Sequence, residues 1–249
     1  MDHLDRVAEP GRALLERVDT ALLNGGAPAG HRVWPLLRRI GALPGDAFDF
    51  TVRLEPTALA SSAAELKSRA ADYVAGRTEL SEPFVAGAWQ GAGADAFGTV
   101  WRALGEHIGD GATADEPSLS GRLLATASYV DSLARWMSDL RVEVALAVAG
   151  ALASAEAVTL RTITLRTAGP LTVRGMFDRI EPPAATEPLH ALAEAAATVA
   201  ARVLDPVLDG LRVAHDLHDE WAPWLAEVRY RPPASGEAGT PGLTTRVGL

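Results

Sequence analysis

Apolar residues in this chain recur mostly at spacings of three and four, which is the period of an α-helix that buries one face. The clearest stripe predicts a helix over residues 57–79, because its members follow one another at spacings of 4, 3, 4 and 3: Leu59, Ala63, Leu66, Ala70 and Tyr73. After a connector that contains Pro83, a second helix is predicted from Ala92 to Gly109. Together these segments predict a helical hairpin.

Two further stretches predict much longer helices. In residues 119–158 the apolar positions form two rows with a repeat of seven, Leu123, Val130, Met137, Val144 and Ala151 in one and Leu133, Leu140 and Ala147 in the other. Ser118 is a suitable N-cap, and residues 158–167 are rich in β-branched side chains that would either continue the helix or form a short strand. The last helix is predicted over residues 188–228, with a kink at Pro206. Their similar lengths allow the two helices to lie antiparallel.

The N-terminal segment has weaker signals. A helix is predicted over residues 2–23 with an interruption at Pro10–Gly11, and a short one over residues 33–40, closed by Pro44–Gly45. The alternation of Phe48, Phe50, Val52 and Leu54 indicates a brief extended stretch. The fold class is therefore all-α: an elongated helical bundle of two hairpins over residues 51–230, with an N-terminal helical extension over 1–50. Residues 231–249, rich in Pro, Gly, Ser and Thr, are expected to form a disordered tail.

Composition excludes several classes of protein. The chain has 249 residues, 48% of them hydrophobic, a net charge of −9 and no cysteine. The acidic balance argues against nucleic acid or an anionic membrane as the main partner, and the lack of cysteine excludes disulfides and thiolate metal sites. The longest weakly polar run covers about ten residues where a spanning helix needs ~20, so membrane insertion is not expected. The basic residues are arginines apart from Lys67, which is typical of a GC-rich bacterial genome.

A short motif lies between the two helices of the first predicted hairpin. Its sequence is Trp89-Gln90-Gly91, followed by small residues and by the aromatic residues Phe97 and Trp101. Glycine permits a backbone turn that other residues resist, and small residues let helix ends approach closely. The motif therefore predicts the turn of an αα-hairpin, with an aromatic stripe that continues along the second helix.

This motif and its flanking helices, over residues 51–110, resemble the WXG-motif superfamily of type VII (ESX) secretion substrates, of which this chain would be an enlarged actinobacterial-type member. The resemblance implies helical hairpins that pair into four-helix bundles and export without a cleaved signal. It also implies that Trp89, Gly91, Phe97 and Trp101 form the motif read by a partner. Small members pair two chains, whereas this chain supplies at least four helices itself, so a self-contained bundle is expected.

The chain departs from the family pattern in its export signal. The family pairs Trp-x-Gly with Tyr-x-x-x-Asp/Glu, and none of Tyr73, Tyr129 and Tyr230 is followed by an acid at that spacing. The nearest match is Phe177-x-x-x-Glu181. Either a partner supplies the signal or the protein remains inside the cell as a helper.

Catalytic motifs are not found in the sequence: it has no Gly-rich phosphate loop, Gly-x-Ser-x-Gly elbow or His-Glu-x-x-His helix. His215 and His218 lie near several acids, but this cluster is interpreted as a solvated helix face rather than a metal site. Glu187-x-x-His190 has di-iron spacing without the second pair that such a site needs. We therefore expect a protein that is not an enzyme and has no metal or cofactor.

The expected function is that of a non-enzymatic type VII secretion-associated protein, either an exported substrate or its helical binding partner. Recognition would be helix against helix, with a small WXG-type protein, a toxin or the secretion ATPase as the partner. Localisation would be secreted or cell-surface by a leaderless route, or cytoplasmic. The alternative is a cytosolic helical scaffold or antitoxin-like partner in which Trp-x-Gly is only a structural turn.

Overall fold

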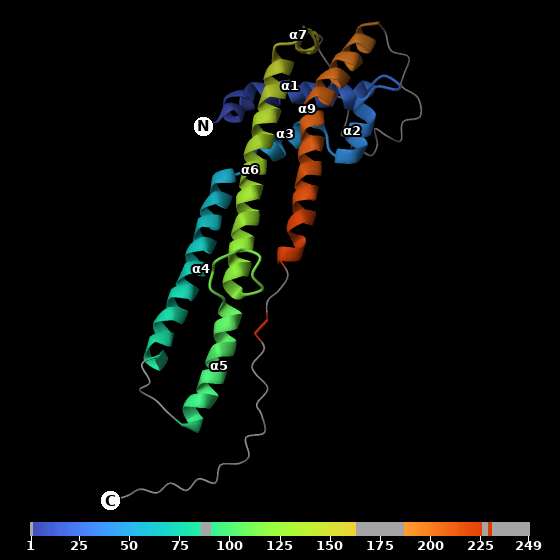
Figure 1. The fold of residues 1–249 in the computed structure, drawn as a ribbon. Coiled ribbons are helices and arrows are strands. Elements are labelled where there is room, and N and C mark those ends of the chain that lie inside the picture. Colours follow the sequence, from blue (N-terminus) through green and yellow to red (C-terminus); the bar gives the residue numbers. More distant parts are fainter. Residues whose placement is uncertain (1, 86–90, 163–186, 226–228, 231–249) are drawn as a thin grey trace, which may run out of the picture. The chain divides into compact units, whose positions relative to one another are not determined.

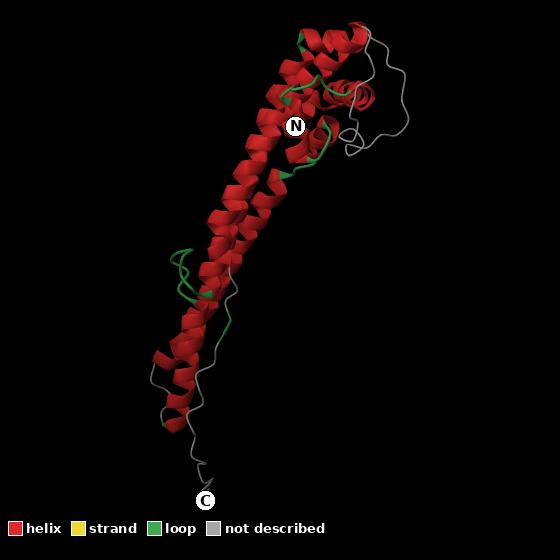
Figure 2. Cartoon of the chain, turned by 90° about the vertical axis from the view of Figure 1, so that its right-hand side faces the viewer, coloured by secondary structure: helices red, strands yellow, loops and turns green. Residues whose placement is uncertain are grey.

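A computed structural model of the chain describes residues 2–85, 91–162, 187–225 and 229–230 (Figure 1). All regular secondary structure in these ranges is helical (Figure 2), so the chain is an all-α helical bundle, as its periodicity predicts. The helices are α1 (His3–Gly25), α2 (Val33–Ile40), α3 (Pro44–Val52), α4 (Pro56–Val85), α5 (Ala92–Ile108), α6 (Leu119–Leu152), α7 (Ala155–Thr162) and α9 (Glu187–Trp221), followed by the 3-10 helix η1 (Ala222–Leu225).

The chain divides into two compact units. Unit 1 consists of Met1–Ser61 and Tyr129–Trp221, and unit 2 of Ser62–Ser128 together with the chain from Ala222. Both α4 and α6 contribute residues to each unit. The N-terminal segment that the sequence analysis gives as a helical extension is grouped in unit 1 with residues 129–221.

The core of unit 1 is made by α1, α2, α3, α6, α7 and α9. Alanine supplies much of it on α9, where Ala196, Ala197, Ala200 and Ala201 are fully buried. Such small side chains let the neighbouring helices approach closely, and large residues such as Leu15, Phe48 and Leu204 fill the remaining space. The alanine-rich composition therefore serves close packing of helices.

The long helices α6 and α9 are antiparallel in unit 1. The Trp136 Nε1–H of α6 donates to the Gly210 carbonyl of α9 at 2.8 Å. Further along, Arg202 Nη1 of α9 donates to the Gly150 carbonyl of α6 at 3.1 Å. Because the contact points run in opposite directions along the two helices, the antiparallel arrangement predicted from their lengths is confirmed.

Residues 44–52 form α3, so the extended stretch expected from the alternation of Phe48, Phe50 and Val52 was wrong. Pro44 lies in the first turn of the helix, where its fixed φ is favourable, rather than closing the preceding helix. The buried positions recur at helical spacing, with Pro44, Ala47, Phe48 and Thr51 on one face. Phe50 is 44% exposed, so only one of the two phenylalanines belongs to the core.

Helix α1 continues through Pro10, where the sequence predicted an interruption. The glycine that follows Pro10 has a packing role, because a Cβ at Gly11 would lie 2.9 Å from Val148 Cγ1 and 3.0 Å from Phe48 Cζ. Glycine is therefore required for the close approach of α1 to α3 and α6, and the Pro-Gly pair marks a packing contact rather than a break.

The expected end of α4 at residue 79 was wrong, because the helix continues through Pro83 to Val85, into the predicted connector. The other boundaries are close to those expected. Ser118 caps α6, because its Oγ accepts from the Gly121 N–H at 3.1 Å. The predicted helix over residues 119–158 is broken after Leu152, and α7 follows at a bend of 63°. Residues 158–162 are helical; 163–167, the end of the predicted last helix at 226–228 and the expected tail at 231–249 lie outside the described residues.

Arg141 of α6 ties the start of α1 to the end of α3 within unit 1. Its side chain is only 8% exposed, and its Nε and Nη2 donate to Asp2 Oδ2 at 2.6 Å and Asp5 Oδ1 at 2.7 Å. The two aspartates also cap α1 by accepting each other's backbone N–H. Arg141 Nη1 donates to three carbonyl oxygens at the end of α3, those of Thr51, Val52 and Leu54. The hydrogen bond from Arg141 lowers the pKa of Asp2 to about 2.

Asp19 of α1 holds the first turn of α3. Its carboxylate oxygens accept from the Gly45 N–H at 3.3 and 3.1 Å. Burial of the carboxylate raises its pKa to about 7, although the Gly45 hydrogen bond acts in the opposite direction. The negative charges of Asp46, Asp49 and Glu16 raise the pKa further.

We expect the stability of unit 1 to depend on the ionisation of Asp19. In the unfolded chain this carboxyl returns to its ordinary pKa of 3.8, whereas the native state holds its proton up to about pH 7. The native state thus binds this proton more tightly than the unfolded chain does. The proton's contribution to the free energy of unfolding is complete below pH 3.8 and is lost as the pH rises through 7. The free energy of unfolding should fall across this window by up to about 1.4 kcal/mol per pH unit. Urea unfolding measured at several pH values checks this.

The Asp19→Asn variant is the control, because its amide oxygen can still accept from Gly45 but cannot ionise. Its free energy of unfolding should change less with pH than that of the wild type. Identical pH profiles for the two proteins would contradict the role given to Asp19.

Candidate functional site

The predicted hairpin turn leads into α5 at Gly91. This residue is the N-cap of α5 and has a φ of +103°, a conformation that favours glycine. Its carbonyl accepts the Asp95 N–H at 3.1 Å, which closes the first turn of the helix. Gly91 thus lies where the motif places it, whereas Trp89 lies outside the described residues.

A set of polar contacts fixes α5 against α4 within unit 2; Figure 1 labels the two helices. Trp101 Nε1 donates to Ser81 Oγ at 3.1 Å, and Ser81 Oγ donates to the Arg77 carbonyl at 2.7 Å. The Arg77 guanidinium donates to the carbonyls of Gly105, at 3.3 Å, and Gly109, at the C-terminal end of α5. Since later residues of α5 meet earlier residues of α4, the two helices form the antiparallel hairpin that the sequence predicts.

The two aromatic residues of the motif lie together on α5. The rings of Phe97 and Trp101 are stacked, with centroids 6.2 Å apart and planes 10° from parallel. Trp101 is half-buried against α4, while Phe97 is 37% exposed. Of the four predicted site residues, the structure therefore places Gly91 at the start of α5 and brings Phe97 and Trp101 into contact.

Sequence reasoning missed an exposed apolar surface on this hairpin. No residue of α5 (Ala92–Ile108) is buried, although the helix is rich in apolar side chains. On α4, Tyr73 and Leu80 are 48% and 58% exposed, and Val100 of α5 is also exposed. We call the following set, in which four side chains are exposed and Leu66 and Leu104 are half-buried, the exposed apolar face: Leu66, Tyr73, Leu80, Phe97, Val100 and Leu104. The heptad spacing of the α4 members was visible in the sequence. The sequence did not show that no other helix would cover this row.

These residues lie on the same side of the hairpin. Successive residues of a helix turn by about 100°. On α4, Arg77 and Ser81 contact α5. The row of Leu66, Tyr73 and Leu80 lies on one side of these two positions. On α5, Trp101 and Gly105 contact α4, and Phe97, Val100 and Leu104 lie on one side of them. Because the two helices are antiparallel, this is the same side of the hairpin as the row on α4.

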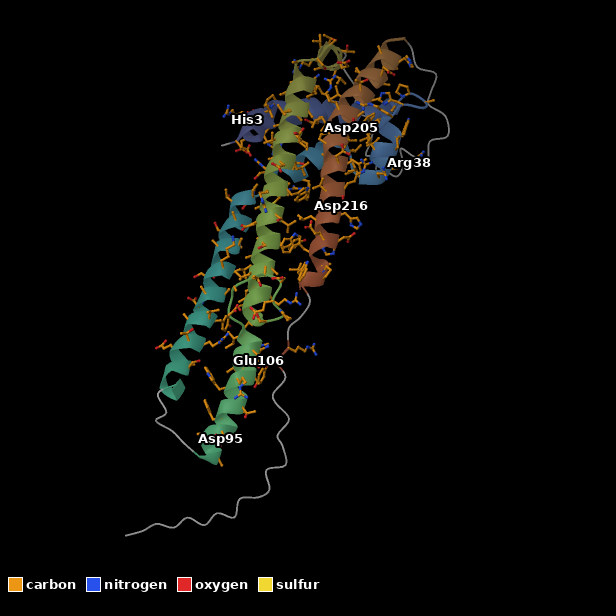
Figure 3. The ribbon with its side chains drawn as sticks, in the orientation of Figure 1. His3, Arg38, Asp95, Glu106, Asp205 and Asp216 are labelled. Atoms are coloured by element: carbon orange, nitrogen blue, oxygen red, sulfur yellow. The ribbon has the colours of Figure 1, made fainter. Side chains whose placement is uncertain are left out.

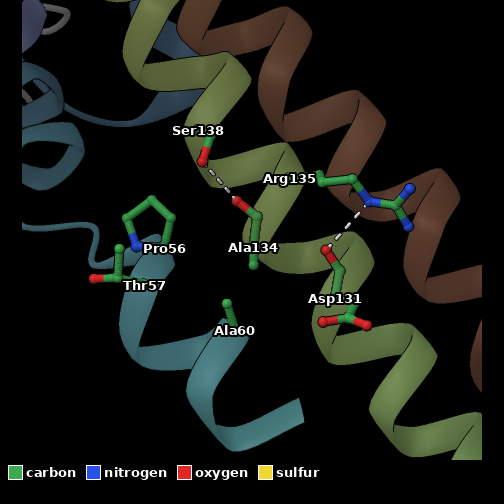
Figure 4. A pocket seen from close by; sticks show the side chains of 7 residues that line it. All are labelled: Pro56, Thr57, Ala60, Asp131, Ala134, Arg135 and Ser138. Carbon is green, nitrogen blue, oxygen red and sulfur yellow. Dashed lines mark hydrogen bonds between the residues drawn. The ribbon is translucent and has the colours of Figure 1, made fainter. Parts of the chain in front are cut away.

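Two pockets are lined by both polar and apolar residues. In unit 2 a pocket of about 500 Å³ lies beside Trp101, with Arg77, Arg102 and Glu106 among its lining residues (Figure 3). In unit 1 a pocket of about 480 Å³ lies between the start of α4 and α6 (Figure 4). There Ser138 Oγ donates to the Ala134 carbonyl, and Arg135 donates to the Asp131 carbonyl and to Ser132 Oγ. Neither pocket places a nucleophile beside a base.

The candidate metal ligands lie on exposed positions of α9. His215 Nε2 is 3.6 Å from Asp219 Oδ2, and both side chains are largely exposed. His190 is exposed near the start of the same helix. Within the described residues, no three His, Cys, Asp or Glu side chains are grouped so that they could hold a metal ion.

No known protein family, curated protein or solved structure matches this chain significantly. In the part of the chain that the structure describes, no single helix is long and apolar enough to cross a membrane. The bent pair of α6 and α7 meets these two requirements only when both helices are taken together.

Proposed function

We propose that this chain is a non-enzymatic protein of a type VII secretion system, either an exported substrate or the helical binding partner of one. The proposal is carried by the α4–α5 hairpin, in which an apolar helix that follows a Trp-x-Gly turn has no buried residue. A contiguous exposed apolar surface on a helix is typical of a site that another helix covers. Recognition would therefore be helix against helix, with Gly91 setting the start of α5.

One feature of the sequence favours a second candidate function, that of a helper protein in the cytoplasm. None of its tyrosines is followed by an acid at the spacing of the family's export signal. A helper that stays in the cytoplasm and binds its partner through the same hairpin would need no such signal. The two candidates share the interface and differ only in whether the protein leaves the cell.

The motif is tested by the variants Trp89→Ala and Gly91→Asp in the native host. We expect each to reduce recovery of the native partner, and the amount of protein in the culture medium, by about tenfold or more. An aromatic anchor often supplies that much binding energy, and the backbone of Gly91, with φ of +103° and ψ of 179°, lies in a region that is essentially restricted to glycine. Partner recovery is measured by co-purification, and helicity by circular dichroism.

Gly30→Asp is the matched control, because Gly30 has a φ of +75° and open space around it but lies outside the motif. It should leave export and partner recovery unchanged. If the motif variants lose the partner and the wild-type protein is itself absent from the medium, the result would support the cytoplasmic helper. Unchanged recovery in both motif variants would refute the proposed function.

A further inference from the structure

We propose that the exposed apolar face of the α4–α5 hairpin binds a helix whose apolar stripe is flanked by lysine or arginine, and not a second copy of this chain. The inference deepens the proposed function and rests on it only in taking the partner to be helical. It follows from two parallel rows of side chains on α4 and from the charge of the chain.

The first row is apolar. Leu66, Tyr73 and Leu80 are separated by seven residues each, which is the repeat that keeps side chains on one seam of paired helices. Ala63 and Ala70, which lie beside this row on the same apolar stripe, are the buried residues of α4. The row is therefore the exposed edge of the apolar stripe of α4, with Leu66 half-buried, and Phe97 and Val100 of α5 broaden it.

The second row is acidic and lies about 100° around α4 from the first. Glu65, Asp72 and Glu79 also repeat every seven residues, each preceding a member of the apolar row by one position. All three are exposed. Glu65 has a loose ion pair with Arg69 at 3.9 Å, while Asp72 and Glu79 have no ion-pair partner within the described residues. Ser62, Arg69 and Gly76 lie between the two rows, and the acidic row is in the position that flanks the seam of paired helices.

The acidic row determines which helix fits. In paired helices, charges that flank the apolar seam select the partner, because like charges repel and opposite charges attract across the interface. A second copy would bring another acidic row, and the chain as a whole carries a net charge of −9. Lysine or arginine on the partner would instead pair with Glu65, Asp72 and Glu79. Exposed ion pairs are individually weak, so three of them together predict about a tenfold preference.

The test uses the full-length protein and two synthetic amphipathic peptides of about four heptads. Both carry the same leucine stripe; lysine flanks it in one and glutamate in the other. Fluorescence anisotropy at moderate ionic strength should show that the lysine-flanked peptide binds about tenfold more tightly. The triple variant Glu65→Lys, Asp72→Lys and Glu79→Lys should reverse this preference, and Leu80→Asp should weaken binding of both peptides.

The control variant reverses three exposed acids on α9, with Asp216→Lys, Asp219→Lys and Glu220→Lys (Figure 3 labels Asp216). It changes the net charge by the same amount and should keep the preference of the wild type. Equal binding of the two peptides, or loss of the preference in the control, would overturn the proposal. So would a stable dimer of the protein in sedimentation equilibrium under the same conditions.

The result of the peptide-binding assay can be separated from the result of the test of the proposed function. The peptide assay involves neither export nor the native host. A charge preference that follows the α4 row, combined with export and partner recovery that ignore Trp89 and Gly91, would refute the secretion role and leave the helix-binding face in place. The reverse pattern would refute the basic partner and leave the secretion role.

Discussion

Replacing Phe48 with alanine should lower the free energy of unfolding by about 4 kcal/mol, the largest stability effect that we expect for a single side chain. Phe48 of α3 is completely buried, and its ring faces Gly11 of α1. Truncation removes the apolar surface that the ring buries and leaves a cavity between helices that already pack too closely to rearrange. Urea unfolding followed by circular dichroism measures the change.

Phe50→Ala provides the matched control on the same helix. Its side chain is 44% exposed, so the same chemical truncation should cost less than about 1 kcal/mol. Similar losses in the two variants would mean that α3 does not bury the face described here. A small loss for Phe48→Ala alone would mean that unit 1 does not depend on the packing of α3 against α1.

Replacing Arg141 with methionine should lower the free energy of unfolding by about 3 kcal/mol. The guanidinium is nearly buried and donates to two carboxylates and three backbone carbonyls that belong to α1 and to the end of α3. Methionine preserves much of the packing volume but leaves these acceptors without their donor, which costs more than a lost surface ion pair. Urea unfolding at neutral pH measures the loss.

Arg135→Met is the control for this substitution. Arg135 also lies on α6, but it donates hydrogen bonds to Asp131 and Ser132 of the same helix, so its loss should change stability by less than about 0.5 kcal/mol. The difference between wild type and Arg141→Met should also narrow in acid. The pKa of Asp2 is about 2 in the native state against an ordinary 3.8, so its share of the stability is present above pH 3.8 and lost as the pH falls through 2. Equal losses in the two arginine variants would contradict the role of Arg141.

Local sequence patterns predicted the helices with clear caps and stripes. Residues 33–40 form α2 as predicted, and α5 begins at Ala92 and ends before Gly109. Residues 44–52 were mispredicted because a short helix and a strand can share the same few apolar positions, and burial of Phe48 against α1 decides between them. The grouping of residues 1–61 with 129–221 depends on contacts between distant segments, which a local period does not record.

The candidate site was predictable to a similar extent. Gly91 could be placed at a turn because its neighbours and its conformational freedom are local properties, and Phe97 and Trp101 follow at a helical spacing that brings their rings together. The exposed state of Tyr73 and Leu80 was not predictable, because they lie at one edge of the apolar stripe of α4 and the sequence does not say how much of that stripe the rest of the chain covers.

The division of the chain also determines the order in which the protein can fold during synthesis. Unit 1 joins α1, α2 and α3 to α9, so its core cannot close until the ribosome has made the chain as far as Trp221. At ordinary rates of translation, helices α1 to α3 therefore wait on the order of ten seconds for their partner. The α4–α5 hairpin has all its residues by Ile108 and can form during this interval. We expect the nascent N-terminal helices, rather than the hairpin, to be the part of the chain that needs a chaperone.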